Sequence, residues 1–160
     1  VNSIIKAVEK EPAVLGIHDL MVHNYGPGKV FASMHVEVDA SGDLMKSHDM
    51  IDNIEKFVKE SLHIEFVVHM DPVVTDDPLI TKLRAIISDS FKDLDGVENI
   101  HDFRIVPGPT HTNIIFDVVL SPSCKFSEKE ILETANRAVS SVDNRYFTVI
   151  TFDRAYTKLH

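Results

Sequence analysis

The five residues Gly16-Ile17-His18-Asp19-Leu20 return 83 positions later as Asn99-Ile100-His101-Asp102-Phe103. A second pair keeps nearly the same offset, because Val67-Val68-His69-Met70-Asp71 matches Val149-Ile150-Thr151-Phe152-Asp153 at a distance of 82 positions. Two blocks held at a nearly constant offset indicate duplication of a unit of about 80 residues. The sequence therefore predicts two copies of one small fold within the 160 residues.

Each copy has the same predicted order of helices and strands. The second copy opens with a clear helix start, with Asp77 as N-cap and Pro78 at the first helical position. Its later helix begins after Ser127, and Glu130 completes a capping box there. Gly26-Pro27-Gly28 marks the turn between the paired strands of the first copy. We expect helices over 2–10, 43–62, 78–94 and 127–143, and strands over 14–24, 30–39, 64–71, 98–106, 112–121 and 146–153.

The order α-β-β-α-β, repeated once, predicts an α+β fold. It consists of two tandem ferredoxin-like modules, residues 1–75 and 76–160, each a three-stranded sheet with two helices on one face. Alternation along the strands supports this packing, because residues two apart point to the same side of a sheet. The core side of the strand over 30–39 carries Val30, Ala32, Met34, Val36 and Val38, and the other side carries Phe31, Ser33, His35 and Glu37. The face without helices must be polar or covered by a partner.

Charge and composition exclude several classes of function. The net charge of −9 argues against nucleic acid or an anionic membrane surface as a partner. The charge is uneven, since residues 1–76 hold six Lys/Arg against thirteen Asp/Glu and six of the nine histidines. An acidic, histidine-rich half is typical of cation binding, although a solvated acidic surface is an equal alternative on composition alone.

The single cysteine, Cys124, excludes an intrachain disulfide and thiolate sites of the CxxC type, which fits a reducing compartment. No apolar run approaches 18 residues, so no segment of this sequence is predicted to span a bilayer. The chain begins at Val1, and we expect further sequence upstream of it.

Four side chains of the first copy are predicted to share the open face of its sheet. His69 and Asp71 are two residues apart on one strand, His35 lies on the neighbouring strand, and His18 lies on the strand that forms a hairpin with it. Imidazoles with a carboxylate suit Zn²⁺, which takes three or four N/O ligands at about 2.0–2.2 Å, and Asp71 has two oxygens with which to bridge two ions. Spacing alone leaves a metal site and a polar surface as equal alternatives; His48, on the second helix, is geometrically the weakest candidate.

Four motifs of the first copy occur in a characteristic order. GIHDL at 16–20 precedes Tyr25-Gly26, and it is followed by MHVEVD at 34–39, SHDMIDNIE at 47–55 and VVHMDP at 67–72. In these motifs residues 14–73 resemble the C-terminal cytoplasmic domain of cation diffusion facilitators, which are divalent-metal efflux transporters. The set is specific when taken together, whereas any one motif would be weak.

The resemblance implies a site and a function. The implied metal ligands are His18, His35, His48, His69 and Asp71, in a binuclear site between two protomers of a homodimer. The implied whole is a transporter with an upstream transmembrane domain, whose soluble domain lies on the cytoplasmic side of the cell membrane. Cytosolic metal bound at the dimer interface would favour the closed, active state. Zn²⁺ suits these ligands, as do Mn²⁺, Fe²⁺, Co²⁺ or Cd²⁺.

The second copy departs from the pattern. His101 and Asp153 remain, but Thr151 stands at the position of His69, the second-strand motif reads IIFDVV, and the later helix has no histidine. We therefore expect no metal site of the same kind there. The tandem arrangement resembles longer bacterial members of the family.

Two other functions compete with a transporter domain. A small-molecule regulatory module of the amino-acid-binding type also uses tandem ferredoxin-like units, but it would be expected to carry glycine-rich loops in place of a histidine cluster. A metal-dependent hydrolase would hold a catalytic ion on His18, His69 and Asp71, with Glu37 as general base. We expect no enzyme, because the predicted site lies on a flat sheet face and enzymes bind substrates in clefts.

Overall fold

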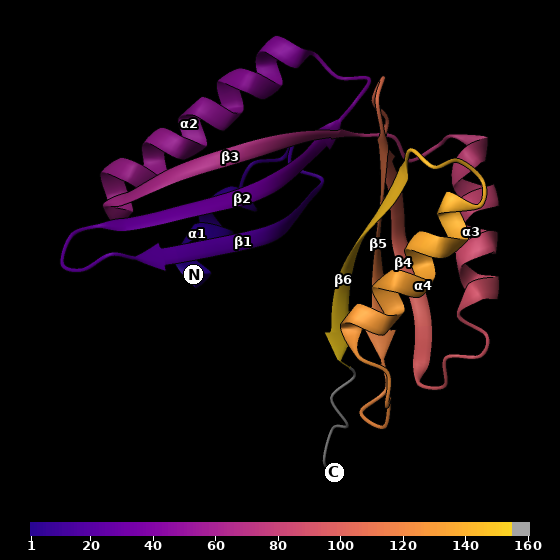
Figure 1. Cartoon of the computed structure of the whole chain (residues 1–160). Coiled ribbons are helices and arrows are strands. Elements are labelled where there is room, and N and C mark those ends of the chain that lie inside the picture. The colour runs from indigo at the N-terminus through magenta and orange to yellow at the C-terminus, as the bar shows by residue number, and fades with distance from the viewer. Residues whose placement is uncertain (155–160) are drawn as a thin grey trace. The chain divides into compact units, whose positions relative to one another are not determined.

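The chain folds as two α+β units. The computed structural model describes residues 1–154. The first unit comprises Val1–Val73 and the second begins at Val74. Figure 1 shows the first unit in indigo to magenta and the second in pink to yellow. In the described part of the chain, no helix combines the length and the apolar character needed to cross a membrane.

Both units have the element order that the sequence predicts (Figure 1). The elements of the first unit are α1 (Asn2–Val8), β1 (Gly16–Asn24), β2 (Val30–Asp39), α2 (Leu44–Leu62) and β3 (Ile64–Val73). Those of the second are α3 (Pro78–Ser90), β4 (Val97–Val106), β5 (Thr112–Leu120), α4 (Glu128–Ser140) and β6 (Tyr146–Arg154). The predicted fold class, two α-β-β-α-β modules, is confirmed.

Each sheet has three strands with the second strand of the unit in the centre. The orders are β1-β2-β3 and β4-β5-β6. The hairpin partners are antiparallel, and the central strand pairs in parallel with the last one. A parallel pair requires a crossover connection, which α2 and α4 supply. In the first unit the parallel register sets His35 beside His69 and Glu37 beside Asp71.

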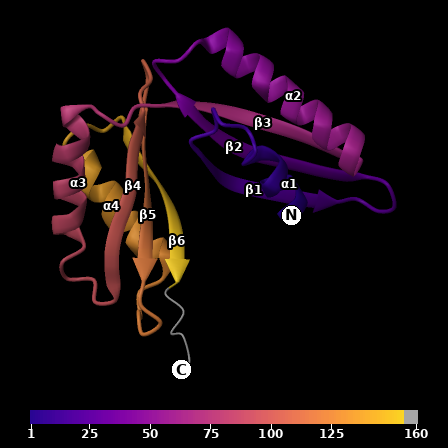
Figure 2. The same cartoon turned by 180° about the vertical axis from the view of Figure 1, so that it is seen from behind.

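The helices of each unit cover one face of its sheet (Figures 1 and 2). In the first unit, the core joins both helices to alternate residues of β2, namely Ile4, Val8, Ile51, Ile54, Val58, Ala32, Met34, Val36 and Val38. In the second unit the same layers contribute Leu83, Ile87, Ile131, Ala135, Val139, Ile114, Phe116, Val118 and Leu120. Of the five β2 residues that the alternation assigns to the core, Ala32, Met34, Val36 and Val38 are buried against the helices, whereas Val30 at the start of the strand is only partly buried.

Helix α2 extends past the core at its N-terminal end. Asp43 caps it by accepting hydrogen bonds from the backbone N–H groups of Met45 and Lys46. Apolar residues at helical spacing over 43–62, with Leu44 and Met45 among them, predict one stripe that faces the core, yet Leu44 and Met45 are both exposed. The buried residues of α2 start only at Ile51. Periodicity identifies the stripe, but it cannot tell how far the sheet reaches beneath it.

The repeated His-Asp pair forms a β-bulge in both units. His18 pairs with His35 and Met21 with Ser33, so two residues of β1 face one residue of β2. Asp19 has φ of 52°, in the left-handed region that aspartate tolerates better than most residues. The extra residue lets Ile17 and Leu20, three apart, both pack against the core. His18 consequently points to the side of the sheet without helices.

Candidate metal centre

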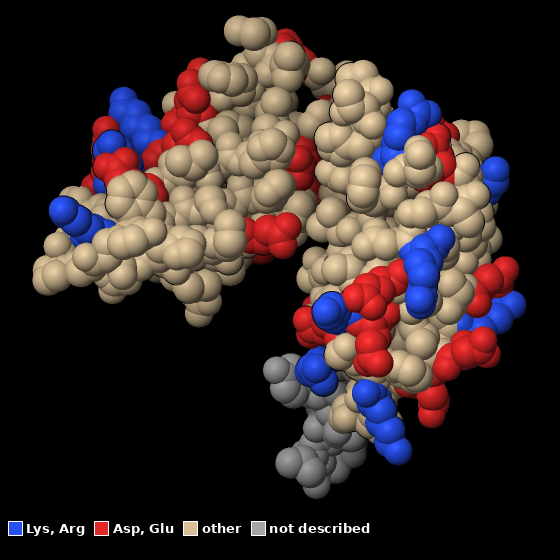
Figure 3. All heavy atoms as spheres, viewed as in Figure 1, with Lys and Arg blue, Asp and Glu red and all other residues tan. Residues whose placement is uncertain are grey.

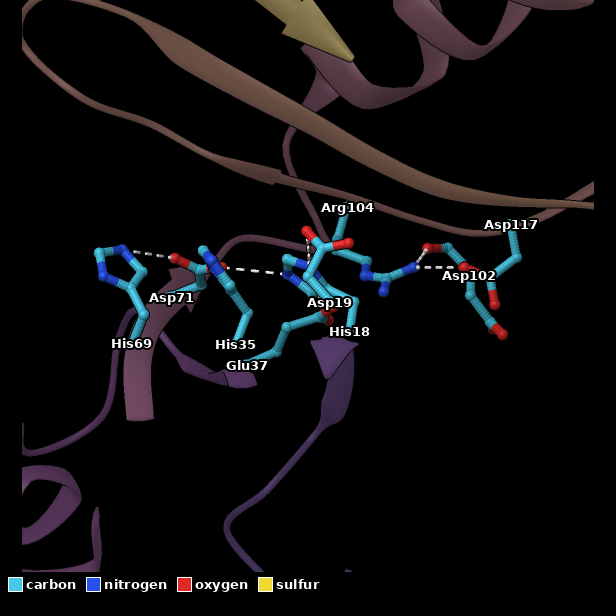
Figure 4. A network of polar contacts seen from close by, with 9 residues as sticks. All are labelled: His18, Asp19, His35, Glu37, His69, Asp71, Asp102, Arg104 and Asp117. Atoms are coloured by element: carbon cyan, nitrogen blue, oxygen red, sulfur yellow. Dashed lines mark hydrogen bonds and ion pairs between the residues drawn. The ribbon is translucent and has the colours of Figure 1, made fainter. Parts of the chain in front are cut away.

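One carboxylate of the first unit contacts three imidazoles. The Oδ2 atom of Asp71 lies 3.1 Å from Nε2 of His18 and 2.9 Å from Nδ1 of His35. The Oδ1 atom lies 3.3 Å from Nε2 of His69. Figure 4 shows these side chains converging on Asp71. Both oxygens of one carboxylate are thus within reach of groups that can share a metal ion.

All three strands contribute to this cluster. His18 comes from β1, His35 from the central strand β2, and His69 and Asp71 from β3. The rings lie side by side across the sheet, with centroids 4.7 Å apart for His18 and His35 and 4.6 Å apart for His35 and His69. The bulge at His18 and the parallel register of β2 and β3 therefore determine the geometry of the cluster.

The cluster runs from a buried end to an exposed end. The side chains of His18 and Asp71 are 4% and 8% exposed, whereas that of His69 is 69% exposed. His35 lies between them in position and is partly exposed. An ion could reach the cluster from the His69 side without unfolding the sheet.

Burial and mutual contact set the protonation of the buried pair. Burial lowers the pKa of His18, but its hydrogen bonds to Asp71 and Asp19 outweigh this and raise the pKa above the usual value. Burial raises the pKa of Asp71, and the contacts with His18 and His35 outweigh it and lower the pKa below its usual range. A proton on His18 and the negative charge of Asp71 therefore stabilise each other, and His35 adds to the stabilisation of Asp71.

The residues fit a divalent cation. One ligand atom each from His18, His35 and Asp71 lies within 4.8 Å of the other two. Tetrahedral coordination with bonds near 2.0–2.1 Å requires ligand atoms about 3.3–3.4 Å apart. The two nitrogen-to-oxygen distances of 3.1 and 2.9 Å need to open by only a few tenths of an ångström.

Asp19 orients His18 and was not among the predicted site residues. Its Oδ2 atom lies 3.1 Å from Nδ1 of His18, which leaves Nε2 of the same ring directed at Asp71. A carboxylate on the far nitrogen of a metal-binding histidine fixes its tautomer and ring orientation. The signal was present in the sequence, because Asp follows His in both copies of the repeat.

Glu37 adds a further carboxylate at the buried end. It is 2% exposed, and its Oε1 atom lies 3.8 Å from Nε2 of His18. A Cβ atom at Gly16 would lie 2.8 Å from Oε2 of Glu37, so the glycine that begins GIHDL leaves the space that this side chain occupies. Sequence reasoning considered Glu37 only as the general base of a hydrolase.

His48 lies outside this cluster. It is on α2, its side chain is 65% exposed, and its Nδ1 atom lies 3.7 Å from a carboxylate oxygen of Asp52. The group of side chains close enough to share an ion contains His18, His35 and Asp71, to which His69 is attached through Asp71.

A second group occupies the corresponding positions of the second unit. His101, Asp117 and Asp153 offer ligand atoms within 4.8 Å of one another. Asp117 pairs with His101 as His35 pairs with His18, and it also contacts the Arg104 guanidinium at 3.2 Å. Burial raises the pKa of Asp117, although the Arg104 contact opposes the shift. Sequence reasoning treated IIFDVV only as a loss of histidine and missed this aspartate.

Fold and cluster together define the first unit as a small α+β module with a histidine-carboxylate face. Residues 1–73 match the family model described as the cytoplasmic domain of cation efflux proteins. This part of the chain is therefore similar to the cytoplasmic domains of cation efflux proteins.

Two relatives and two solved structures illustrate the match. The cation-efflux pump FieF of Shewanella oneidensis is 38% identical over 71 residues, 43% of this chain and 24% of that protein. FieF of Yersinia enterocolitica is 31% identical over 72 residues, 44% of this chain and 24% of that protein. The chain therefore spans about a quarter of the length of these relatives.

The solved structures cover the same share of the chain. The cytosolic domain of a cation diffusion facilitator family protein is 26% identical, with a TM-score of 0.40, and covers 44% of this chain and 86% of its own. The metal-bound C-terminal domain of the CzcD transporter from Thermotoga maritima is 26% identical, with a TM-score of 0.41, and covers 44% of this chain and 84% of its own.

Proposed function

We propose that this chain is the cytoplasmic regulatory and dimerisation part of a divalent cation efflux transporter. Its first module binds cytosolic metal, with Zn²⁺ favoured by two or three imidazoles and a carboxylate. The site lies where two protomers meet, and its occupation favours the closed, active state. The upstream transmembrane domain carries the ion, and the domain described here acts on the cytoplasmic side of the cell membrane without catalysing a reaction.

The observation that carries the proposal is the use of both Asp71 oxygens. His18 and His35 contact one oxygen, and His69 contacts the other. A carboxylate so placed can bridge two ions, one held with His18 and His35 and the other with His69. The second ion then has only His69 and Asp71 as proposed ligands from its own chain, so it needs a further ligand from another chain.

The partner subunit's His48 is the donor that we propose. His48 lies outside the cluster of its own chain and is exposed, so it is available to a second copy. Leu44 and Met45, one turn before it, are exposed apolar residues of the kind that dimer contacts bury. The open sheet face adds Phe31 and Val67, which are also exposed. A homodimer that covers these residues would bring His48 to the cluster of the facing chain.

Metal would act by shifting a population. A ligand that binds one of two conformations favours that conformation by its difference in affinity. A site at 100 times its dissociation constant supplies about 2.7 kcal/mol. Two such sites in a dimer are enough to convert a mostly open population into a mostly closed one. The thirteen Asp/Glu of residues 1–76 lower the electrostatic cost of holding the ions.

Titration calorimetry with Zn²⁺ at about pH 7 tests the site. The parent chain should bind tightly, and a His35→Ala, His69→Ala, Asp71→Ala variant should not. His23→Ala is the matched control, because His23 is an exposed histidine of the same sheet outside the cluster. Equal binding by the parent and the triple variant would refute the site.

Mixing two defective chains tests the shared site. His48→Ala keeps the cluster but lacks the proposed donor, and His69→Ala with Asp71→Ala keeps the donor but lacks the cluster residues that hold the second ion. A mixed dimer contains one complete site for both ions, so an equimolar mixture should bind the second ion, which neither chain binds alone. Analytical ultracentrifugation should show a metal-dependent dimer. A mixture no better than its components would exclude the donation by His48 between chains.

A further inference from the structure

The second module keeps the layout of the first cluster with harder ligands. His101 comes from β4, Asp117 from β5 and Asp153 from β6, so each strand again supplies one ligand. Nε2 of His101 lies 3.8 Å from Oδ2 of Asp153. The strand register equates Asp117 with His35, and the repeat equates Asp153 with Asp71. The position of His35 is therefore occupied by the carboxylate of Asp117, and the position of His69 by Thr151.

The imidazole of this group is held in the orientation that binding needs. Oδ2 of Asp102 lies 3.1 Å from Nδ1 of His101, the distance found between Asp19 and His18. Asp102 also has a positive φ of 53° at an identical bulge. This contact leaves Nε2 of His101 directed at Asp153. A backbone conformation that is sparsely populated for aspartate is thus retained in both modules at the residue that orients the histidine.

Arg104 distinguishes the second group from the first. It occupies the register position of Met21, directly after the bulge. Its Nη1 atom donates to Oδ1 of Asp117 at 3.2 Å and to the carbonyl oxygen of Asp102. The guanidinium places a permanent positive charge on one of the three ligands. An ion bound at this group must either displace that contact or bind beside it against repulsion.

We propose that His101, Asp117 and Asp153 form a second divalent-cation site, in which Arg104 is a built-in competitor. One imidazole and two carboxylates suit harder ions than the first cluster does, with Mn²⁺ better matched than at a site dominated by imidazole. The site is weaker than the first because Arg104 holds Asp117. It fills only at metal concentrations above those that fill the first module, which gives the tandem chain two thresholds.

Electron paramagnetic resonance of Mn²⁺ measures free and bound ion directly. The full chain carries His35→Ala and His69→Ala to disable the first cluster. This background should bind one Mn²⁺ per chain. Adding Asp153→Asn, a change at an exposed side chain, should weaken binding at least tenfold, and His101→Ala should abolish it. Adding Arg104→Met, which introduces the residue of the first module, should strengthen binding about tenfold or more.

Circular dichroism melts establish that each variant is folded. Failure of the background and of Arg104→Met to bind Mn²⁺ up to about 1 mM would overturn the proposal. Binding that Asp153→Asn and His101→Ala leave unchanged would overturn it as well. These outcomes are separated from the first module, because His35 and His69 of its cluster are already replaced.

Discussion

Replacing Asp19 with glycine tests how the first cluster is organised. Asp19 is proposed to bind no metal itself, and it holds His18 by a 3.1 Å contact to Nδ1. Glycine tolerates the φ of 52° at this position, so the backbone of the bulge is retained while the carboxylate is removed. The expected result is a weaker metal site in a chain that is still folded.

The expected loss of metal affinity follows from the contact of Asp19 with His18 and from the exposure of Asp19. Groups that orient a metal-binding histidine typically contribute 10- to 100-fold in affinity. Asp19 is 61% exposed, and solvent screens it, so we expect the lower end, about tenfold or 1.4 kcal/mol. Asp19 also helps to raise the pKa of His18, so its removal relieves proton competition at low pH. The loss should therefore be largest near pH 8 and smaller near pH 6.

Competition against a chromophoric Zn²⁺ chelator at about pH 8 measures this affinity where protons compete least. Asp102→Gly is the matched control, since it makes the same change at the equivalent bulge with φ of 53°. It should change the affinity of the first-module site by less than about twofold, because sites in separate units act additively. The reasoning is refuted if Asp19→Gly binds as tightly as the parent, or if Asp102→Gly weakens that site equally.

Three further predictions concern stability. The first concerns His18 in metal-free protein with a chelator present. Because its pKa is raised in the folded state, His18 contributes stability that is fully present below its ordinary pKa of 6.5 and is lost as pH rises through the folded pKa. His18→Gln should flatten this pH dependence of the free energy of unfolding, measured by urea titrations. Ser127→Ala removes the capping hydrogen bond of α4 and should destabilise the second unit by about 1 kcal/mol, measured by thermal melts. Gly16→Ala places a Cβ 2.8 Å from Oε2 of Glu37 and should destabilise the first unit by about 1–3 kcal/mol. Adding Glu37→Ala should recover part of that loss, and a strictly additive double variant would contradict the clash.

The fold was predictable because its signals are local or periodic. Asp77 and Ser127 start helices through their own hydrogen bonds to nearby backbone, and the alternation along β2 separates core from open face. Because the sequence repeats, the order of helices and strands in one unit predicts the order in the other. The exposed first turn of α2 at Leu44 and Met45 was missed because its environment depends on how far the sheet extends.

The identity of the chemical groups was also readable from the sequence. His18, His35, His69 and Asp71 were predicted to share one face, and strand periodicity with the strand order is enough to place them together. The roles of Asp19 and Asp117 were not predicted from the sequence. Asp19 acts through the ring of its neighbour, and Asp117 becomes apparent only when the register sets it beside His101.

The amino-acid sequence by itself determined the order of elements, the duplication and the residue types that suit a cation site. Short-range periodicity and repeated motifs can be recognised without the tertiary structure. The tertiary structure alone decided which atoms meet. The bulge at Asp19 sets the direction of His18, and the parallel register sets His35 beside His69. Strand pairing joins residues that are far apart in the chain, and a shift of one position would turn each of these side chains to the other face.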